Sequence, residues 1–225
     1  MQGLMMDRPL LVSTLLQHAE ATYPNTEIVS RRCEGDIHRY TMKDAASRAR
    51  KVANLLTRLD IQDSDRVATL AWNNYRHFEL YYGISGFGAV LHTINPRLFA
   101  EQLVYIINHA EDRYIFVDLT FVPLLEAILP HIGNVEGFII LCDEDKMPET
   151  KLPNAQCYET LLAAESDEFE WPEFPETKGA SMCYTSGTTG NPKGVLYSHR
   201  STCLHAFASV GEEAVSYTHL RAHET

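Results

Sequence analysis

The sequence has few basic residues for its length. Its 225 residues include 19 Lys and Arg against 30 Asp and Glu, which gives a formal net charge of -11. Proteins that bind nucleic acid neutralise phosphates with clustered Lys and Arg, so this balance argues against a nucleic-acid partner. The five cysteines form no C-x-x-C pair, and neither a thiolate zinc site nor a disulfide framework is therefore indicated. Cysteines used in this way suit a reducing compartment, and we expect a cytoplasmic protein.

Long apolar runs are also missing. No stretch approaches the roughly 20 apolar residues that a helix needs to cross a bilayer, so no transmembrane segment is expected. The N-terminus lacks the basic start and unbroken apolar segment of a secretion signal, because Asp7, Arg8 and Pro9 interrupt it early. With 45% hydrophobic residues, the chain has the composition of a globular protein that buries a sizeable core.

From Arg66 onward, short apolar runs alternate with longer amphipathic ones. The expected strands are 67–72, 89–93, 114–117 and 138–142, and the expected helices are 13–22, 41–59, 75–86, 99–109 and 122–131. This alternation predicts an α/β fold with a mostly parallel sheet flanked by helices. Thr41 and Asp44 are suited to cap one helix, and the glycine-rich turn 83–88 predicts the exit of another. The acidic, proline-rich stretch 143–178 predicts a surface connection with one helix near 157–164.

The most informative segment is Tyr184-Thr-Ser-Gly-Thr-Thr-Gly-Asn-Pro-Lys-Gly194, which joins a predicted buried strand to a second strand. Its glycines let the backbone approach an anion closely, so that successive N–H groups can converge on it. Its hydroxyls add donors, and its lysine adds a mobile positive charge that can meet the outer phosphates of a nucleotide. The residues expected to hold the phosphates are Thr185, Ser186, Gly187, Thr188, Thr189, Gly190 and Lys193.

Other interpretations of this segment are less favoured. A Walker A loop needs Gly-Lys followed by Ser or Thr, whereas Lys193 stands between Pro192 and Gly194. A nucleophile elbow needs Gly-x-Ser-x-Gly, a pattern in which Ser186 does not lie. A flexible turn is the ordinary explanation of a short glycine and serine match, but this run is long and lies between two apolar strands.

The segment 184–194 resembles the signature phosphate loop of the acyl-adenylating superfamily, which includes acyl-CoA synthetases and peptide-synthetase adenylation domains. The resemblance extends through residues 65–74, 86–97 and 114–118 and covers nearly all of 10–211. Within the superfamily, residues 92–98 and 197–201 are most similar to medium- and long-chain fatty acyl-CoA ligases and methylmercaptopropionyl-CoA ligases.

The resemblance implies a chemistry and a set of small-molecule partners. A carboxylic acid, either fatty or with a short thioether chain, would attack the α-phosphate of ATP, and coenzyme A would then capture the acyl-adenylate. Residues 185–190 and Lys193 would hold the phosphates, Thr185 would help to place Mg²⁺, and the full enzyme could be a homodimer. Two alternatives stay open: an amino-acid adenylation domain that delivers to a carrier protein, and a non-catalytic nucleotide-binding module.

The resemblance to the superfamily does not extend to the last residues of the chain. Residues 1–214 would form a partial N-terminal AMP-binding domain, truncated after the phosphate loop, whereas 215–225 resemble read-through from a cloning adaptor. The family's adenine, ribose and C-terminal lysine motifs do not occur, so we expect the chain alone to be inactive. His219 and His223 share a helical spacing but lack a third metal ligand.

Further side chains receive structural interpretations. His199 is interpreted as a polar residue at a helix start rather than a phosphate ligand. Trp72, Tyr81 and Tyr82 are expected in core or interface packing, and Cys183 in a buried strand.

Overall fold

The computed structural model describes residue 5, residues 7–185 and residues 191–210. A two-stranded antiparallel sheet pairs β1 (Glu27–Arg31) with β2 (Ile37–Thr41), and a seven-stranded sheet has the order β7-β6-β5-β3-β4-β8-β9. The larger sheet consists of β3 (Arg66–Leu70), β4 (Val90–Thr93), β5 (Tyr114–Asp118), β6 (Gly137–Leu141), β7 (Gln156–Cys157), β8 (Gly179–Thr185) and β9 (Lys193–Ser198). Its neighbours pair in parallel except for β9, which runs antiparallel to β8. The mostly parallel sheet predicted from the sequence is confirmed.

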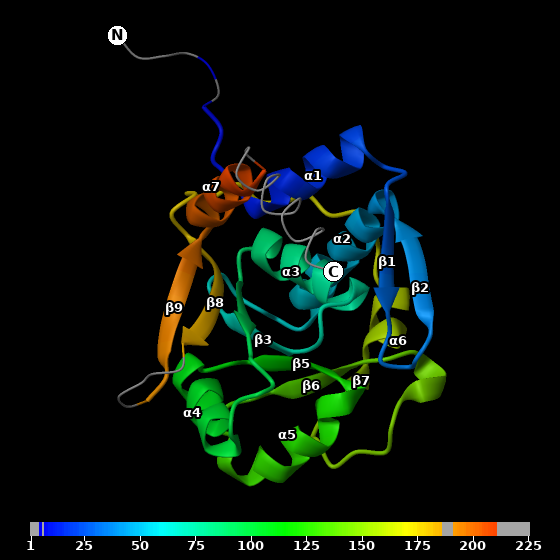
Figure 1. The fold of residues 1–225 in the computed structure, drawn as a ribbon, viewed down its shortest axis with the longest axis vertical. Coiled ribbons are helices and arrows are strands. Elements are labelled where there is room, and N and C mark those ends of the chain that lie inside the picture. The colour runs from blue at the N-terminus through cyan, green and yellow to red at the C-terminus, as the bar shows by residue number, and fades with distance from the viewer. Residues whose placement is uncertain (1–4, 6, 186–190, 211–225) are drawn as a thin grey trace, which may run out of the picture.

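Helices cover both faces of this sheet (Figure 1). They are α1 (Val12–Thr22), α2 (Met42–Arg58), α3 (Tyr75–Phe87), α4 (Ala100–Ala110), α5 (Val122–Ile128), α6 (Tyr158–Ala163) and α7 (His199–Ser209), with short 3₁₀ turns at Leu119–Phe121, Leu129–His131 and Glu144–Lys146. In Figure 1, α2 and α3 lie above the central strands, and α4 and α5 lie below them.

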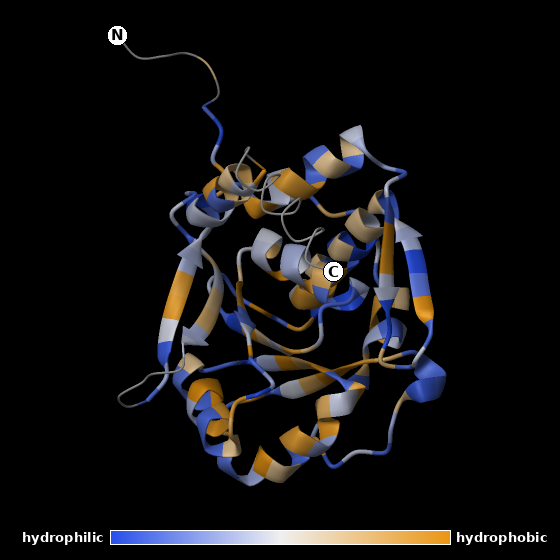
Figure 2. Cartoon of the chain, viewed as in Figure 1, coloured by the Kyte–Doolittle hydropathy of each residue, from blue (hydrophilic) through white to orange (hydrophobic). Residues whose placement is uncertain are grey.

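Side chains of the central strands alternate between the two helical layers. Ile115 and Ile140 pack towards α4 and α5, whereas Phe116 and Ile139 pack towards α2, α3 and α6. This follows from the pleat of a strand, which points successive side chains to opposite faces. Because both faces are covered, the central strands are apolar almost throughout, as the largely orange β5 and β6 show in Figure 2.

Local signals fix several helix ends. Thr41 and Asp44 form the predicted capping box at the start of α2. Gly88 ends α3 in the left-handed conformation with φ of 106°, which glycine adopts at little cost. The predicted turn is wrong at Gly83, which lies inside α3. A Cβ there would come within 2.5 Å of Val52 Cγ1, so this glycine serves the close approach of α3 to α2.

A buried charged group joins three of the upper helices. Glu79 of α3 is fully buried and accepts hydrogen bonds from Arg48 Nε of α2 and the Tyr158 hydroxyl of α6, each at 2.7 Å. Burial raises the pKa of the Glu79 carboxyl, while Arg48 opposes this shift. Such a carboxylate is stable inside a protein only when it is paired and hydrogen-bonded, so these contacts specify how the helices pack.

Some expectations are corrected by the structure. The β1–β2 hairpin was not predicted, because its strands are half polar and have one exposed side. Trp72 is 42% exposed, so it does not pack in the core, and its expected place in an interface stays a prediction. Cys183 is only half-buried in β8. The helix predicted near 157–164 is confirmed as α6. Across the described ranges, no helix combines the length and apolar character needed to span a membrane.

Candidate functional site

The sheet offers a crevice at the carboxyl ends of its parallel strands. Neighbouring strands β3 and β4 are followed by α3 and α4, which pack on opposite faces of the sheet. Where adjacent strands send their connections to opposite faces, the chain leaves a gap between them, and ligands of α/β proteins bind there. The segment 71–74 after β3 and Thr93 at the end of β4 border this gap.

The phosphate hairpin, defined here as the paired strands β8 and β9, reaches the same edge of the sheet. Thr185 and Lys193 lie opposite each other in the antiparallel register at the base of the loop. The Thr185 hydroxyl lies 3.5 Å from the Lys193 carbonyl oxygen, a long hydrogen bond, and both residues are exposed. The remaining predicted phosphate ligands, 186–190, lie outside the described residues, so their role stays a prediction.

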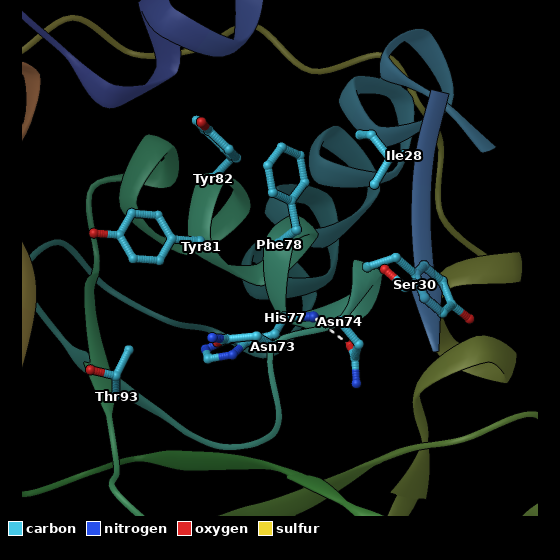
Figure 3. Close-up of a pocket in the computed structure, with 10 residues that line it drawn as sticks. Ile28, Ser30, Asn73, Asn74, His77, Phe78, Tyr81, Tyr82 and Thr93 are labelled. Atoms are coloured by element: carbon cyan, nitrogen blue, oxygen red, sulfur yellow. Dashed lines mark hydrogen bonds between the residues drawn. The ribbon is translucent and has the colours of Figure 1, made fainter. Parts of the chain in front are cut away.

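Next to the gap lies a cavity of about 560 Å³. As Figure 3 shows, Phe78, Tyr81 and Tyr82 of α3 form one side of it, and Ile28 of β1 lies opposite. The sequence analysis assigned the two tyrosines only to packing and missed their place in a cavity wall. Their spacing could have revealed it, because residues at i, i+3 and i+4 share one face of a helix.

A second cavity, of about 540 Å³, lies between α3, α7 and the phosphate hairpin. It shares Tyr81 and Thr93 with the first cavity and is also lined by Met182, Cys183 and Tyr197. The Tyr81 hydroxyl lies 3.4 Å from Ser181 Oγ at this junction. Neither cavity has a carboxylate among its described lining residues. The first presents aromatic, hydroxyl, amide and imidazole groups to a ligand, and the second presents aromatic, hydroxyl, imidazole and sulfur groups.

Hydrogen bonds fix the loop that borders the crevice. The buried Asp118, at the end of β5, accepts a 2.6 Å hydrogen bond from the backbone N–H of Trp72. Asn74 Oδ1 accepts from the backbone N–H of His77 at 3.1 Å and so caps α3. Burial raises the pKa of the Asp118 carboxyl and lowers the pKa of the His77 imidazole, which therefore stays neutral at neutral pH.

His199 begins α7, as the sequence analysis predicted, but its side chain is fully buried. Its Nδ1 accepts a 3.1 Å hydrogen bond from the backbone N–H of Val12, at the start of α1. Burial, together with the nearby positive charge of Lys178, lowers the pKa of His199 to about 4. The imidazole is therefore a neutral acceptor that ties α1 to α7.

Within the described part of the chain, no group of three or more His, Cys, Asp or Glu side chains is placed to hold a metal ion. Thr185, the predicted metal ligand, has an exposed hydroxyl at the loop base, and its role in placing a metal stays a prediction. A hydroxyl oxygen is compatible with Mg²⁺, which keeps several waters and binds through substrate phosphates rather than a full protein cage.

The chain is similar to AMP-binding enzymes and to CoA ligases. The profile of a family described as "AMP-binding enzyme" matches residues 16–222. A 3-methylmercaptopropionyl-CoA ligase of Ruegeria lacuscaerulensis is 49% identical over 97% of this chain and 40% of its own length. A medium-chain-fatty-acid–CoA ligase of Ectopseudomonas oleovorans is 44% identical over 93% of this chain and 38% of its own length.

Solved structures agree on the fold. An anthranilate CoA ligase, AuaEII, in complex with anthranoyl-AMP superposes with a TM-score of 0.74 at 21% identity, covering 86% of this chain and 36% of that one. The chain thus spans about two fifths of the length of the curated relatives it matches.

Proposed function

The chain belongs to the AMP-binding enzyme family, and from this premise we propose that its protein is an acid–thiol ligase that joins a carboxylic acid to coenzyme A at the expense of ATP. In the first half-reaction, a carboxylate oxygen bonds to the α-phosphorus of ATP, and the bond from that phosphorus to the bridging oxygen breaks. Pyrophosphate leaves. In the second, the sulfur of coenzyme A bonds to the acyl carbon, the bond from that carbon to the phosphate oxygen breaks, and AMP and the thiol proton leave.

The observation that carries the proposal is the position of the phosphate hairpin. Its base sets Thr185 and Lys193 opposite each other at the carboxyl edge of the parallel sheet. The same hairpin lines one cavity, which shares Tyr81 and Thr93 with a second, and these cavities can admit a second reactant. Catalysis of phosphate displacement depends mainly on alignment and charge neutralisation, which a donor-lined loop and a lysine supply.

Each proposed ligand has a defined task. Lys193 would neutralise charge on the outer phosphates, and residues 185–190 would donate hydrogen bonds to them. Mg²⁺, held by the phosphates with help from the Thr185 hydroxyl, would supply further charge neutralisation on the triphosphate. Residues 1–214 would constitute part of the N-terminal AMP-binding domain and 215–225 a non-native tail, so the chain by itself would be inactive.

For the substrate class, we favour a fatty or short thioether acid. The relatives at 49% and 44% identity are named for a methylmercaptopropionyl and a medium-chain fatty acyl group. The cavities beside the hairpin support this choice over an amino acid, because their described linings contain no carboxylate that could pair with an ammonium group. The rival amino-acid adenylation domain would require a carrier protein as acceptor.

The decisive experiment is ATP–pyrophosphate exchange on the native full-length protein, with a panel of fatty, thioether and amino acids. We expect exchange with a fatty or thioether acid. Lys193→Ala should reduce it about tenfold to a hundredfold, since a hydrogen bond to a charged group contributes about 1.5–3 kcal/mol. Lys43→Ala, at an exposed position of α2, is the matched control and should leave exchange unchanged.

Either of two results would contradict the proposal. A folded full-length protein that exchanges with no acid would favour the non-catalytic nucleotide-binding module, and exchange with amino acids alone would favour the adenylation domain. Exchange by the 225-residue chain would refute its expected inactivity. Mass analysis of the native gene product would test the tail at 215–225, and fractionation and sedimentation would test the predicted cytoplasmic location and homodimer.

A further inference from the structure

A buried ionisable pair lies under the sheet, outside the site described above. His92 of β4 and Asp112, which follows α4, are both fully buried. His92 Nδ1 lies 2.8 and 3.0 Å from the two carboxylate oxygens of Asp112. His92 Nε2 is also buried and has no hydrogen-bond partner among the described residues. Burying such a pair usually stabilises a protein less than apolar packing would, so its presence calls for another explanation.

The pair contacts the strand that leads into the phosphate loop. His92 lies beside Met182 in the parallel register of β4 and β8, and the side chain two residues further on, Tyr184, points to the same face. The rings of His92 and Tyr184 have their centroids 5.2 Å apart. The Tyr184 hydroxyl lies 2.7 Å from Nδ1 of His109 on α4. The Tyr184 side chain is therefore fixed at two points, because its ring lies against the ring of His92 and its hydroxyl is hydrogen-bonded to His109.

Tyr184 also contacts the second strand of the hairpin. It lies opposite Gly194, and a Cβ built on that glycine would come 3.2 Å from Tyr184 Cζ. The ring is thus pressed against the backbone of β9. The next pair in the register is Thr185 with Lys193, the base of the phosphate loop. Any shift of Tyr184 moves both strands at that point.

We infer that the phosphate hairpin is held in the position that ATP binding requires by four positioning residues. They are Tyr184, His109, His92 and Asp112, called here the Tyr184 support. The inference rests on the proposed function and deepens it by naming what fixes the phosphate-binding residues. β9 is an edge strand whose residues are mostly exposed, and the Tyr184 ring, packed against the strand at Gly194, gives it an anchor in the helical layer of α4. Rigid support of this kind is what a binding loop needs, because a displacement of about 1 Å can reduce catalysis about a hundredfold.

The test uses Tyr184→Phe in the native full-length protein, a change that removes one oxygen and keeps the ring. We expect the KM for ATP in pyrophosphate exchange to rise about tenfold, with the KM for the acid within about twofold of the wild-type value. Asp112→Asn should also raise the KM for ATP. Tyr23→Phe, at a tyrosine that is 60% exposed, is the matched control. Circular dichroism and the Tm show whether each variant is folded.

If Tyr184 served stability alone, its substitution would not be coupled energetically to that of Lys193 in the loop. A double-mutant cycle of the two residues measures this coupling. If Tyr184 acts through the hairpin, Tyr184→Phe should have little further effect on the ATP constant once Lys193→Ala is present. Additive effects, or an unchanged ATP constant in a folded Tyr184→Phe enzyme, would overturn the inference. These results presuppose an active wild type, so a wild type without exchange would count against the proposed function instead.

Discussion

Acidification should destabilise the protein in part through the buried imidazole of His199. Its Nδ1 accepts a hydrogen bond from Val12 N–H, and its Nε2 has no partner among the described residues. Protonation would place an N–H opposite the N–H of Val12 and a charge for which the described residues provide no carboxylate hydrogen-bond partner. The folded state therefore holds the pKa at about 4, against 6.5 for an ordinary histidine.

The sign and size follow from proton linkage. Between these two pKa values the unfolded chain binds the proton and the folded chain does not, so acid favours unfolding. The contribution of neutral His199 to the free energy of unfolding is fully present above the pKa of His199 in the unfolded chain. It is lost as the pH falls towards the pKa of His199 in the folded chain. From about pH 7 to about pH 5, the free energy of unfolding should decrease by about 2 kcal/mol from this group alone.

Urea denaturation of the chain at the two pH values measures this loss, and His199→Asn isolates it. Asparagine can accept the hydrogen bond from Val12 without titrating, so the variant should lose about 2 kcal/mol less than the wild type on acidification. Carboxylates and other histidines cancel in this comparison. His131→Asn, at an exposed position, should behave like the wild type. Equal acid losses in wild type and His199→Asn would refute the reasoning.

Further changes test the packing of the upper helices by urea or thermal denaturation. Gly83→Ala should destabilise the chain by about 1–3 kcal/mol through overlap with α2, whereas Gly133→Ala, which meets only one atom at 4.0 Å, should change stability by less than about 0.5 kcal/mol. Arg48→Met would strand the carboxylate of Glu79 and should cost about 3–5 kcal/mol, part of which Glu79→Gln in the same chain should recover. Thr41→Ala removes the cap of α2 and should cost about 1 kcal/mol; an unchanged Tm would show that the capping box contributes nothing.

Much of the fold was predictable because its signals are local. Alternating apolar runs marked the central strands, and the capping box at Thr41 marked the start of α2. The prediction failed where the deciding contact is distant in sequence. Gly83 was assigned to a turn, since only the approach of α2 explains a glycine inside a helix. The β1–β2 hairpin was missed although its connection contains Gly35, which adopts a φ of 101°, because its short strands are half polar and bury one side only.

In the candidate site too, the features set by neighbouring residues were predicted and those set by distant contacts were not. The composition of the loop at 185–193 predicted a phosphate-binding segment, and the resemblance based on it is confirmed at the level of the family. Cys183 was expected inside, and Trp72 in the core or an interface, because they lie in apolar runs, but an apolar run does not reveal how completely its neighbours cover it. The cavity formed by α3 likewise depends on the position of β1, which the sequence analysis did not locate.

The sequence by itself thus determined the alternation of central strands and helices from Arg66 onward and the chemical groups of the phosphate loop, since both are encoded by neighbouring residues. Only the tertiary structure decided which distant groups meet. Val12 and His199 are 187 positions apart, and His109 and Tyr184 are 75 apart. Such pairs form because the helices and strands pack in one arrangement that covers the apolar faces of the sheet, and the periodicity of a single segment contains no information about its partner.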